Sequence, residues 1–255
     1  MVRLFHRDLG GAGRPPLVLL HGLLGSSRNW QTAGTDLAEH FHVRALDLRN
    51  HGRSPQADAM SYEEMMGDVL AWLDAHRLTR VTLLGHSLGG KVAMRLACRT
   101  PARVARLIVV DIAPRDYPEK LERAEFAAMH ALDLAAVKTR ADAERAMEPW
   151  VSDWAMRKFL STNLEQDAAG AWRWAINLSA LTAAVPELIR TPLVEGDRFA
   201  GPARFIVGGR SDFVRAEDHA AIRRHFPAAD IVTLPTGHNP HMESRAELVR
   251  LVVAT

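Results

Sequence analysis

A serine stands between glycines in residues 85–90 (GHSLGG), directly after the apolar run 81–84 and directly before a helical pattern. The spacing Gly-x-Ser-x-Gly between a strand and a helix is typical of a nucleophilic serine on a sharp turn. Such a turn holds the serine in strained dihedrals, and small residues on each side let neighbouring backbone pass close by. We therefore predict that Ser87 is a nucleophile, with the N-terminus of the following helix stabilising negative charge.

A second glycine-containing loop, residues 21–26 (HGLLGS), comes straight after the apolar run 17–20. An acyl-transfer enzyme needs two backbone N–H groups that donate to the oxyanion. In a strand–serine–helix arrangement one donor belongs to the residue after the serine, here Leu88, and the other to a loop after an earlier strand. We expect Leu23 to supply that second N–H; the alternative is a plain glycine turn.

A histidine follows the last apolar run, in residues 236–241 (TGHNPH). A general base must reach the serine hydroxyl, and serine, acid, histidine is one of the chain orders in which such triads occur. We predict that His238 is the base. His241 is the competitor, and it stands closer to the next helix.

Two aspartates compete for the third place in the triad. Asp111 follows the apolar run 107–110, and Asp212 follows the run 205–207 within GGRSD. The ends of parallel strands meet at one edge of a sheet, so both carboxylates should lie near the site. Either could hold the imidazole tautomer and stabilise its cation. Both stay open, with a narrow preference for Asp212.

Other polar and ionisable groups suggest no further chemistry. Residues 47–54 (DLRNHGRS) follow the run 43–46, and their polar density favours a hydrogen-bonded turn near the site over a substrate contact. Cys98 falls inside an apolar helical pattern and is expected to be inert core. The twelve histidines have no metal-ligand spacing and no nucleotide-binding glycine motif is present, so we expect neither a metal nor a cofactor.

Short apolar runs must position these groups, and runs bounded by Gly, Asp or Pro are typical of parallel strands covered on both faces. Helical patterns lie between several of them. One opens with the capping box of residues 61–64 and extends to about His76, and residues 244–247 cap the last. The alternation predicts an α/β fold with a mainly parallel sheet. The runs are residues 17–20, 43–46, 81–84, 107–110, 205–207 and 231–234.

The alternation stops between about 115 and 195, where we expect successive helices and where four of the six tryptophans stand. We predict a helical cap, residues 115–195, inserted into an α/β core of residues 1–114 and 196–255. Its apolar underside could contact substrate, or its aromatic side chains could pack only its own core. Candidates for an acyl pocket are Phe126, Met129, Trp150, Trp154 and Phe159.

Composition narrows the class of protein and its partners. The 255 residues are 47% hydrophobic and 24% charged, with a net charge of +2 and no basic run. This is typical of a globular protein whose main partner is neither nucleic acid nor a membrane. One cysteine excludes an internal disulfide, the first eight residues lack the apolar region of a signal peptide, and no apolar run nears the roughly 18 residues of a membrane span. We expect a cytoplasmic protein.

Five segments together resemble the α/β-hydrolase superfamily and, more closely, its YbfF-type esterases: HGLLGS, DLRNHGRS, GHSLGGK, VVDIAPRDY and GHNPHME. The resemblance runs from about Leu17 to Val252. It implies an eight-stranded, mostly parallel sheet with a helical cap after the sixth strand. It assigns Ser87 and His238 to the triad. The YbfF-type pattern has its aspartate at Asp111, whereas this fold usually supplies the acid where Asp212 stands.

The resemblance also implies carboxylesterase or acyl-thioesterase activity on small to medium acyl chains, with a small-molecule ester or thioester as the partner. Ser87 would attack the carbonyl while His238 takes its proton, and water would then cleave the acyl-enzyme. Carbon–carbon bond hydrolysis and cofactor-free perhydrolysis use the same triad, and a fold alone does not choose between reactions. A ligand sensor that keeps the triad is the alternative outside enzymes.

Overall fold

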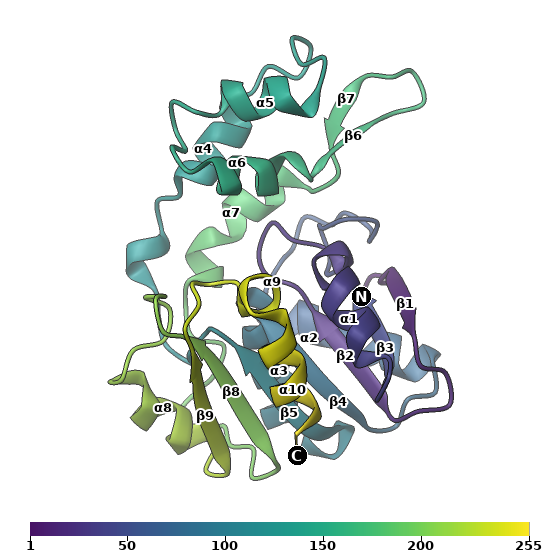
Figure 1. Ribbon diagram of the computed structural model, residues 1–255, viewed down its shortest axis with the longest axis vertical. Helices are drawn as coiled ribbons and strands as arrows, with labels where there is room; N and C mark the ends of the chain where they lie inside the picture. Colours follow the sequence, from purple (N-terminus) through teal and green to yellow (C-terminus); the bar gives the residue numbers. More distant parts are fainter. Residues whose placement is uncertain (255) are drawn as a thin grey trace.

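The computed structural model describes residues 1–254, and a seven-stranded sheet forms its centre. The strand order is β1-β3-β2-β4-β5-β8-β9; β1 is antiparallel to β3, and all other neighbours are parallel (Figure 1). All six apolar runs lie in the parallel strands, which confirms the predicted α/β class. The strands are β1 (His6–Gly10), β2 (Pro16–Leu20), β3 (His42–Leu46), β4 (Val81–His86), β5 (Val104–Val110), β8 (Ala203–Gly208) and β9 (Ala229–Leu234).

Strand β1 is the sheet strand that the apolar pattern did not predict. Its sequence, HRDLG, is polar, and its residues are exposed or half-buried at the outer edge of the sheet. Within residues 1–254 it is the one strand that precedes β2. The sheet therefore has seven strands rather than the eight that the resemblance implied. For the same reason the helical segment, residues 115–195, follows the fifth sheet strand rather than the sixth.

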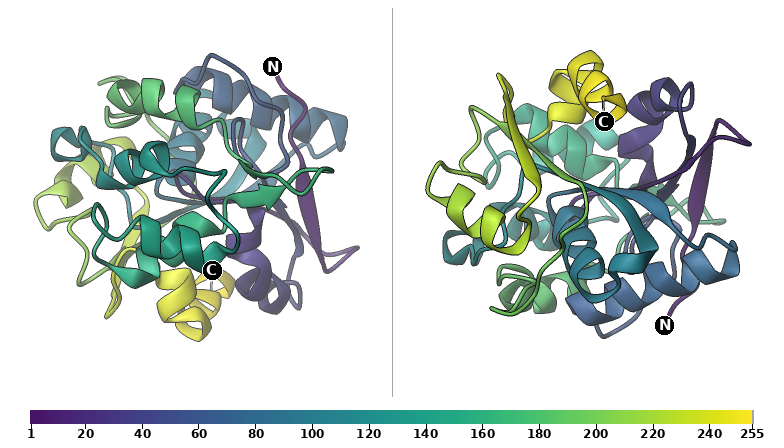
Figure 2. Two further views of the ribbon diagram at one scale, coloured as in Figure 1. Left: turned by 90° about the horizontal axis from the view of Figure 1, so that it is seen from above. Right: turned by 90° about the horizontal axis from the view of Figure 1, so that it is seen from below.

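Helices cover both faces of the sheet (Figure 2). On one face α2, α3 and α8 bury side chains such as Met65, Val92 and Ile222, and on the other α1 and α10 bury Leu37 and Leu251. Burial of this kind is the main source of stability for such a fold. No helix within residues 1–254 has both the length and the apolar character to cross a bilayer. The helices are α1 (Gln31–Leu37), α2 (Tyr62–Ala75), α3 (Leu88–Arg99), α8 (Asp218–His225), α9 (Pro240–Glu243) and α10 (Arg245–Val253), with 3₁₀ turns at Ser27–Trp30 and Pro101–Arg103.

The two predicted helix caps differ in outcome. Ser61 caps α2 with a complete capping box, in which its hydroxyl accepts from Glu64 N and the Glu64 side chain accepts from Ser61 N. Ser244 stands at the start of α10, but its side chain makes no capping hydrogen bond, so that prediction is wrong. The backbone explains the difference, because Ser61 has the extended ψ of 167° that a cap requires and Ser244, which closes α9, has a ψ of 56°.

The helical segment stands over the edge of the sheet at which the parallel strands end (Figure 1). It contains the expected helices and also a short antiparallel hairpin that we did not predict. The hairpin turns at Asp167, whose carboxylate accepts hydrogen bonds from the N–H groups of Ala169 and Ala171. The elements are a 3₁₀ turn (Pro118–Lys120), α4 (Ala124–Ala131), α5 (Arg140–Ala146), α6 (Trp154–Ser161), β6 (Leu164–Gln166), β7 (Trp172–Trp174) and α7 (Leu178–Leu188).

Candidate active site

Ser87 occupies a strained turn between β4 and α3. Its φ of 49° and ψ of −116° are unusual for a residue with a side chain. A Cβ on Gly85 would lie 2.2 Å from the carbonyl oxygen of Gly89, and a Cβ on Gly89 would lie 2.6 Å from that of Leu20. The glycines of the motif are therefore required by close backbone approach, and the turn presents Ser87 at the edge of the sheet.

The loop after β2 approaches Ser87 from the side. A Cβ on Gly22 would lie 3.3 Å from Ser87 Cβ, so the backbone of this loop lies directly against the serine. Gly89 N donates to His21 O at 3.1 Å, which ties the loop to the start of α3. Within residues 1–254 the N–H groups of Leu23 and Leu88 have no hydrogen-bond acceptor. Both residues border a cavity with Ser87, so these N–H groups could donate to a bound oxyanion.

Two buried histidines support that loop, a role that their sequence context did not indicate. Leu48 N donates to His21 Nε2 at 3.0 Å, and Leu24 N donates to His51 Nε2 at 3.2 Å. Burial lowers the pKa of His21 and lowers that of His51 to about 3. Both imidazoles are therefore neutral at neutral pH, as an acceptor nitrogen requires.

The turn of residues 47–54 is a structural support, in agreement with its predicted role. The buried carboxylate of Asp47 accepts from Ser27 N at 2.6 Å and from Arg53 N at 2.8 Å. A Cβ on Gly52 would lie 2.3 Å from Asp47 Oδ2, so the turn closes tightly around this carboxylate. It carries His51 to the loop beside Ser87.

His238 Nδ1 lies 2.7 Å from Asp111 Oδ2. The Asp111 side chain is fully buried, and it also accepts hydrogen bonds from Gly208 N and the Ser211 hydroxyl. Its backbone has a φ of 50°, a strained value that turns the carboxylate from the end of β5 toward His238. Asp111 is thus held by several donors in a position to fix the imidazole.

The structure places Asp212 elsewhere, and the narrow preference for it does not match the geometry. Its side chain is 56% exposed and pairs with Lys120 at 3.1 Å. Both aspartates follow strands that end at the same edge, as expected. The turn after β8, however, directs Ser211 inward to Asp111 and Asp212 outward. The spacing of residues along the sequence does not show in which direction a side chain in this turn points.

Of the two histidines considered as the base, His241 contacts no carboxylate within residues 1–254. Its ring is buried beside Trp30, with centroids 4.6 Å apart, and beside His86. Burial, followed by the nearby His238, lowers the pKa of His241 to about 3. His238 is held instead by Phe213, which stacks on its ring at 3.7 Å, and by His86 Nε2, which donates to its carbonyl at 2.7 Å.

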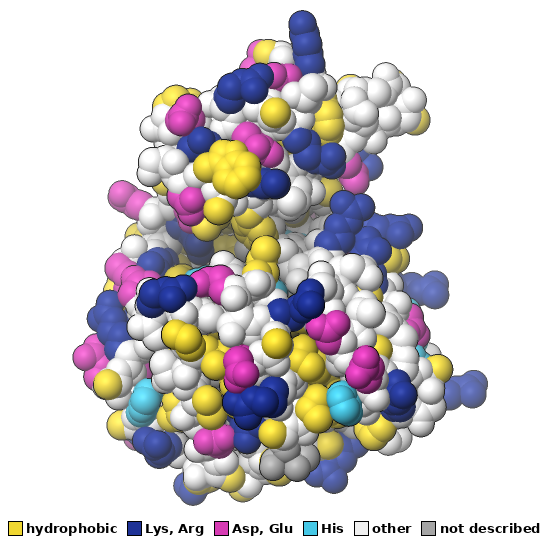
Figure 3. Space-filling model, in the orientation of Figure 1, with side chains coloured by type: hydrophobic (Ala, Val, Ile, Leu, Met, Phe, Trp, Pro, Cys, Tyr) yellow, Lys and Arg dark blue, Asp and Glu magenta, His cyan; other side chains and the backbone are white. Residues whose placement is uncertain are grey.

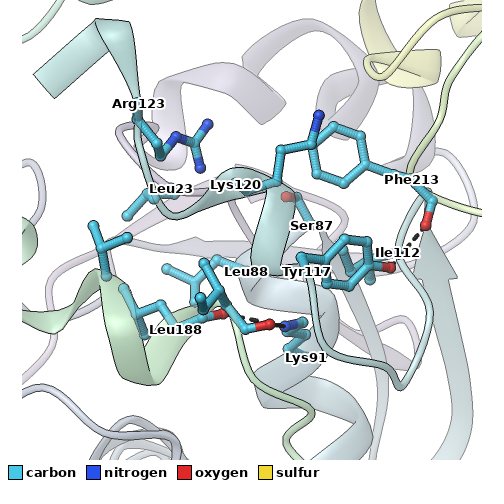
Figure 4. A pocket seen from close by; sticks show the side chains of 12 residues that line it. Leu23, Ser87, Leu88, Lys91, Ile112, Tyr117, Lys120, Arg123, Leu188 and Phe213 are labelled. Atoms are coloured by element: carbon cyan, nitrogen blue, oxygen red, sulfur yellow. Dashed lines mark hydrogen bonds between the residues drawn. The ribbon is translucent and has the colours of Figure 1, made fainter.

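Two cavities meet at Ser87. The larger, about 400 Å³, has Ser87 and His238 in its wall, and the smaller, about 40 Å³, extends under the helical segment (Figure 4). Figure 3 shows the hollow between the segment and the sheet layer. Within residues 1–254 no hydrogen bond joins Ser87 Oγ to His238, which is common in hydrolases without substrate.

The five acyl-pocket candidates are mostly elsewhere. Phe159 lines the larger cavity, whereas Phe126 and Met129 are buried in the hydrophobic core. Trp150 and Trp154 are exposed at the surface. The smaller cavity is instead bordered by apolar residues from five separate stretches of chain, which spacing along the sequence does not bring together: Leu23, Leu88, Ile112, Tyr117, Val185, Leu188, Ile189 and Phe213.

Lys91 is a further residue whose role the sequence did not indicate. It is buried in α3, one turn after Ser87, and burial lowers its pKa to about 7. Its Nζ donates to the carbonyl oxygens of Leu188, Ile189 and Arg190 at 3.1, 3.2 and 2.6 Å. These carbonyls end α7, so Lys91 caps that helix and joins it to the helix of the nucleophile.

Comparison with known proteins agrees with this geometry. Residues 15–244 match the family model described as alpha/beta hydrolase fold. The chain is 35% identical over 253 residues to the sn-1-specific diacylglycerol lipase ABHD11 of Mus musculus, covering 96% of this chain and 82% of the relative. It is 32% identical to Esterase YbfF of Escherichia coli (strain K12), covering 93% and 91%.

A solved structure titled "Marine microorganism esterase" superposes with a TM-score of 0.95 at 34% identity, covering 99% of both chains. The similarity to Esterase YbfF confirms the resemblance drawn from the sequence motifs. The chain therefore belongs to the α/β-hydrolase family and is a hydrolase of the carboxylesterase type.

Proposed function

We propose that this protein hydrolyses carboxylic esters through an acyl-enzyme, with Ser87 as nucleophile, His238 as general base and Asp111 as the acid of the triad. The observation that carries the proposal is the 2.7 Å contact between the buried carboxylate of Asp111 and His238, which borders the same cavity as Ser87. The named activities of the relatives, esterase and lipase, support the same reaction class.

The reaction has two halves. His238 Nε2 takes the proton of Ser87 as Oγ attacks the ester carbonyl, and the N–H groups of Leu23 and Leu88 donate to the oxyanion. His238 then gives that proton to the departing alcohol, which leaves an acyl group on Ser87. Water, deprotonated by His238, cleaves the acyl-enzyme and restores the hydroxyl. Asp111 stabilises the imidazolium in both halves.

Residues 115–195 act in this proposal as a cap over a core of residues 1–114 and 196–255. Arg123, Phe159 and Leu188 of the segment border the two cavities at Ser87, which supports a role in enclosing substrate. Acyl thioesters fit the same machinery. Carbon–carbon hydrolysis and perhydrolysis would use the same groups, but no contact in the site favours either.

The proposal is tested with 4-nitrophenyl acetate and a phosphonate that labels nucleophilic serines. The wild-type chain should give a burst of 4-nitrophenol and one covalent label on the peptide that contains Ser87. Ser87→Ala should lose the burst and the label, with kcat reduced by about 10⁴-fold or more. Ser244→Ala, which removes a hydroxyl that caps no helix, is the matched control. Full activity in Ser87→Ala would contradict the proposal.

A further inference from the structure

The two cavities at Ser87 differ in their relation to His238. Both are bordered by Ser87, Leu23 and Arg123. His238 stands in the wall of the larger cavity together with His86 and His241, whereas the smaller is bordered by Leu88, Ile112 and the end of α7. An ester bound at Ser87 therefore has one cavity that His238 borders and one that His238 does not border.

The chemistry of the proposed triad decides which half of the substrate each cavity receives. The group that leaves must accept a proton from His238, so it has to depart on the histidine side. The acyl group stays on Ser87 and must occupy the other side while water attacks. The cavity of about 400 Å³ is thus the site of the leaving group, and the cavity of about 40 Å³ is the site of the acyl group.

The acyl cavity is small, and hydrogen bonds hold two of its lining side chains in place. One water needs roughly 10–15 Å³ of such a volume, so 40 Å³ holds about three non-hydrogen atoms. Tyr117 is held in the wall by Ala113 N, which donates to its hydroxyl at 2.8 Å, and by Phe213 O, which accepts from it at 2.7 Å. Lys91 donates to the carbonyl oxygens of Leu188, Ile189 and Arg190, the first of which is labelled in Figure 4, so these donors are not available to an acyl group.

The leaving-group cavity is large enough for a sizeable ligand and carries acidic side chains. Its volume lies in the usual range for small-molecule sites. Glu125, Asp153 and Glu243 border it. Arg123, the one cation among its lining residues, lies 3.6 Å from Glu125, and Arg210 lies 3.0 Å from Glu243, so within residues 1–254 Asp153 is the acid of the three that has no ion pair. A leaving group with several phosphates would meet this negative charge at close range, whereas a neutral alcohol or thiol would not.

We propose that the preferred substrates combine a short acyl chain of about two to four carbons with a bulky, uncharged leaving group. This inference rests on the proposed function and adds substrate selection to it. Enzymes of this type separate close substrates by pocket fit, in which one methylene changes kcat/KM by roughly 10–200-fold. The dependence of kcat/KM on the length of the acyl chain should therefore report the size of the smaller cavity.

The first experiment measures kcat/KM for 4-nitrophenyl esters from acetate to dodecanoate. We expect a maximum between two and four carbons and a fall of at least about tenfold by eight carbons. Leu188→Ala, which enlarges the smaller cavity, should move the maximum by two or more carbons. Leu181→Ala, on the same helix and buried in the core away from both cavities, is the matched control and should leave the profile unchanged.

A wild-type maximum at eight carbons or more, or an equal shift in Leu181→Ala, would overturn the acyl assignment. Neither result would affect the proposed function. That function fails separately if no ester is cleaved in a manner that depends on Ser87.

The second experiment compares acetyl coenzyme A with the acetyl thioester of N-acetylcysteamine, which presents the same thioester without nucleotide phosphates. The neutral thioester should have a kcat/KM at least about tenfold higher. Repulsion between a phosphate and one partly buried carboxylate should change kcat/KM by about an order of magnitude. In the double variant Glu125→Gln, Asp153→Asn the kcat/KM values of the two thioesters should lie closer together. Equal values for the two thioesters in the wild type would overturn the assignment of the leaving-group cavity.

Discussion

His238 and Asp111 meet at 2.7 Å although 127 positions separate them in the sequence. The contact joins the loop after β9 to the end of β5, across the intervening strand β8. Gly208 N and the Ser211 hydroxyl, both contributed by the end of β8 and its loop, donate to the same carboxylate. Three strand ends thus fix one imidazole.

Exchanging the carboxylate for an amide tests this contact. Asp111→Asn should lower kcat on 4-nitrophenyl acetate by up to about 10⁴-fold, because an amide can stabilise the wrong tautomer and cannot balance an imidazolium. Asp212→Asn should change kcat less than about threefold, since Asp212 is exposed and paired with Lys120. If kcat fell more in Asp212→Asn than in Asp111→Asn, Asp212, which follows β8, would be the acid of the triad.

A methyl group on the loop beside Ser87 tests the oxyanion donors. In Gly22→Ala the new Cβ would lie 2.9 Å from His86 Nδ1 and 3.3 Å from Ser87 Cβ, which displaces the backbone that carries Leu23 N–H. Loss of one such donor costs about 3 kcal/mol of transition-state stabilisation, so kcat should fall by 10²-fold or more while KM changes little. Gly196→Ala, where nothing lies within 4 Å, is the control. An unchanged kcat in Gly22→Ala would exclude this loop from the reaction.

Buried neutral histidines predict loss of stability in acid. Burial, the largest effect, lowers the pKa of His51 to about 3, whereas the unfolded chain has the ordinary value of 6.5. Between these pH values the His51 side chain binds a proton in the unfolded state and not in the folded state. The contribution of His51 to the free energy of unfolding is therefore fully present above pH 6.5 and is lost as the pH falls toward 3. The free energy of unfolding in urea, measured from pH 7 to pH 4, should therefore fall less steeply in His51→Gln than in the wild type. His40→Gln, at an exposed position, should keep the wild-type slope. If the free energy of unfolding fell with pH at the same rate in all three proteins, His51 would not be the buried neutral histidine described above.

Removing the buried amino group of Lys91 tests the link between α3 and α7. Lys91→Met leaves the carbonyl oxygens of residues 188–190 without their donor and should cost about 2–3 kcal/mol. For a chain of this size that lowers Tm by roughly 5–10 °C. Lys138→Met, at an exposed lysine of the helical segment, should leave Tm within about 1 °C. A Tm for Lys91→Met equal to that of the control would mean that the end of α7 is held by other contacts.

Local signals in the sequence predicted the parallel strands and the turn at Ser87, because each depends on nearby residues. Apolar runs identify buried strands, and the glycines around Ser87 are required by close backbone approach. Strand β1 lacks such a signal, since it is polar and lies at the edge of the sheet. The hairpin of β6 and β7 is short and likewise showed no strand pattern.

The choice between Asp111 and Asp212 depended on side-chain direction, which local pattern does not encode. Both follow strands that end at the same edge of the sheet, and the positive φ of Asp111 decides which one meets His238. The walls of the smaller cavity likewise come from distant segments, such as Ile112 and Val185. Long-range packing, rather than residue type, determines these parts of the site.

The ties between the helical segment and the sheet layer have a consequence for protein engineering. Asn163 Nδ2 donates to Leu24 O, Asn177 N donates to Asn50 O, and Lys91 holds the end of α7. These anchors lie outside residues 124–162, which include α4, α5 and α6. That stretch is therefore the natural module to exchange between homologous enzymes. A chimera in which residues 124–162 are exchanged would receive a new wall for the leaving-group cavity and keep the parental acyl cavity.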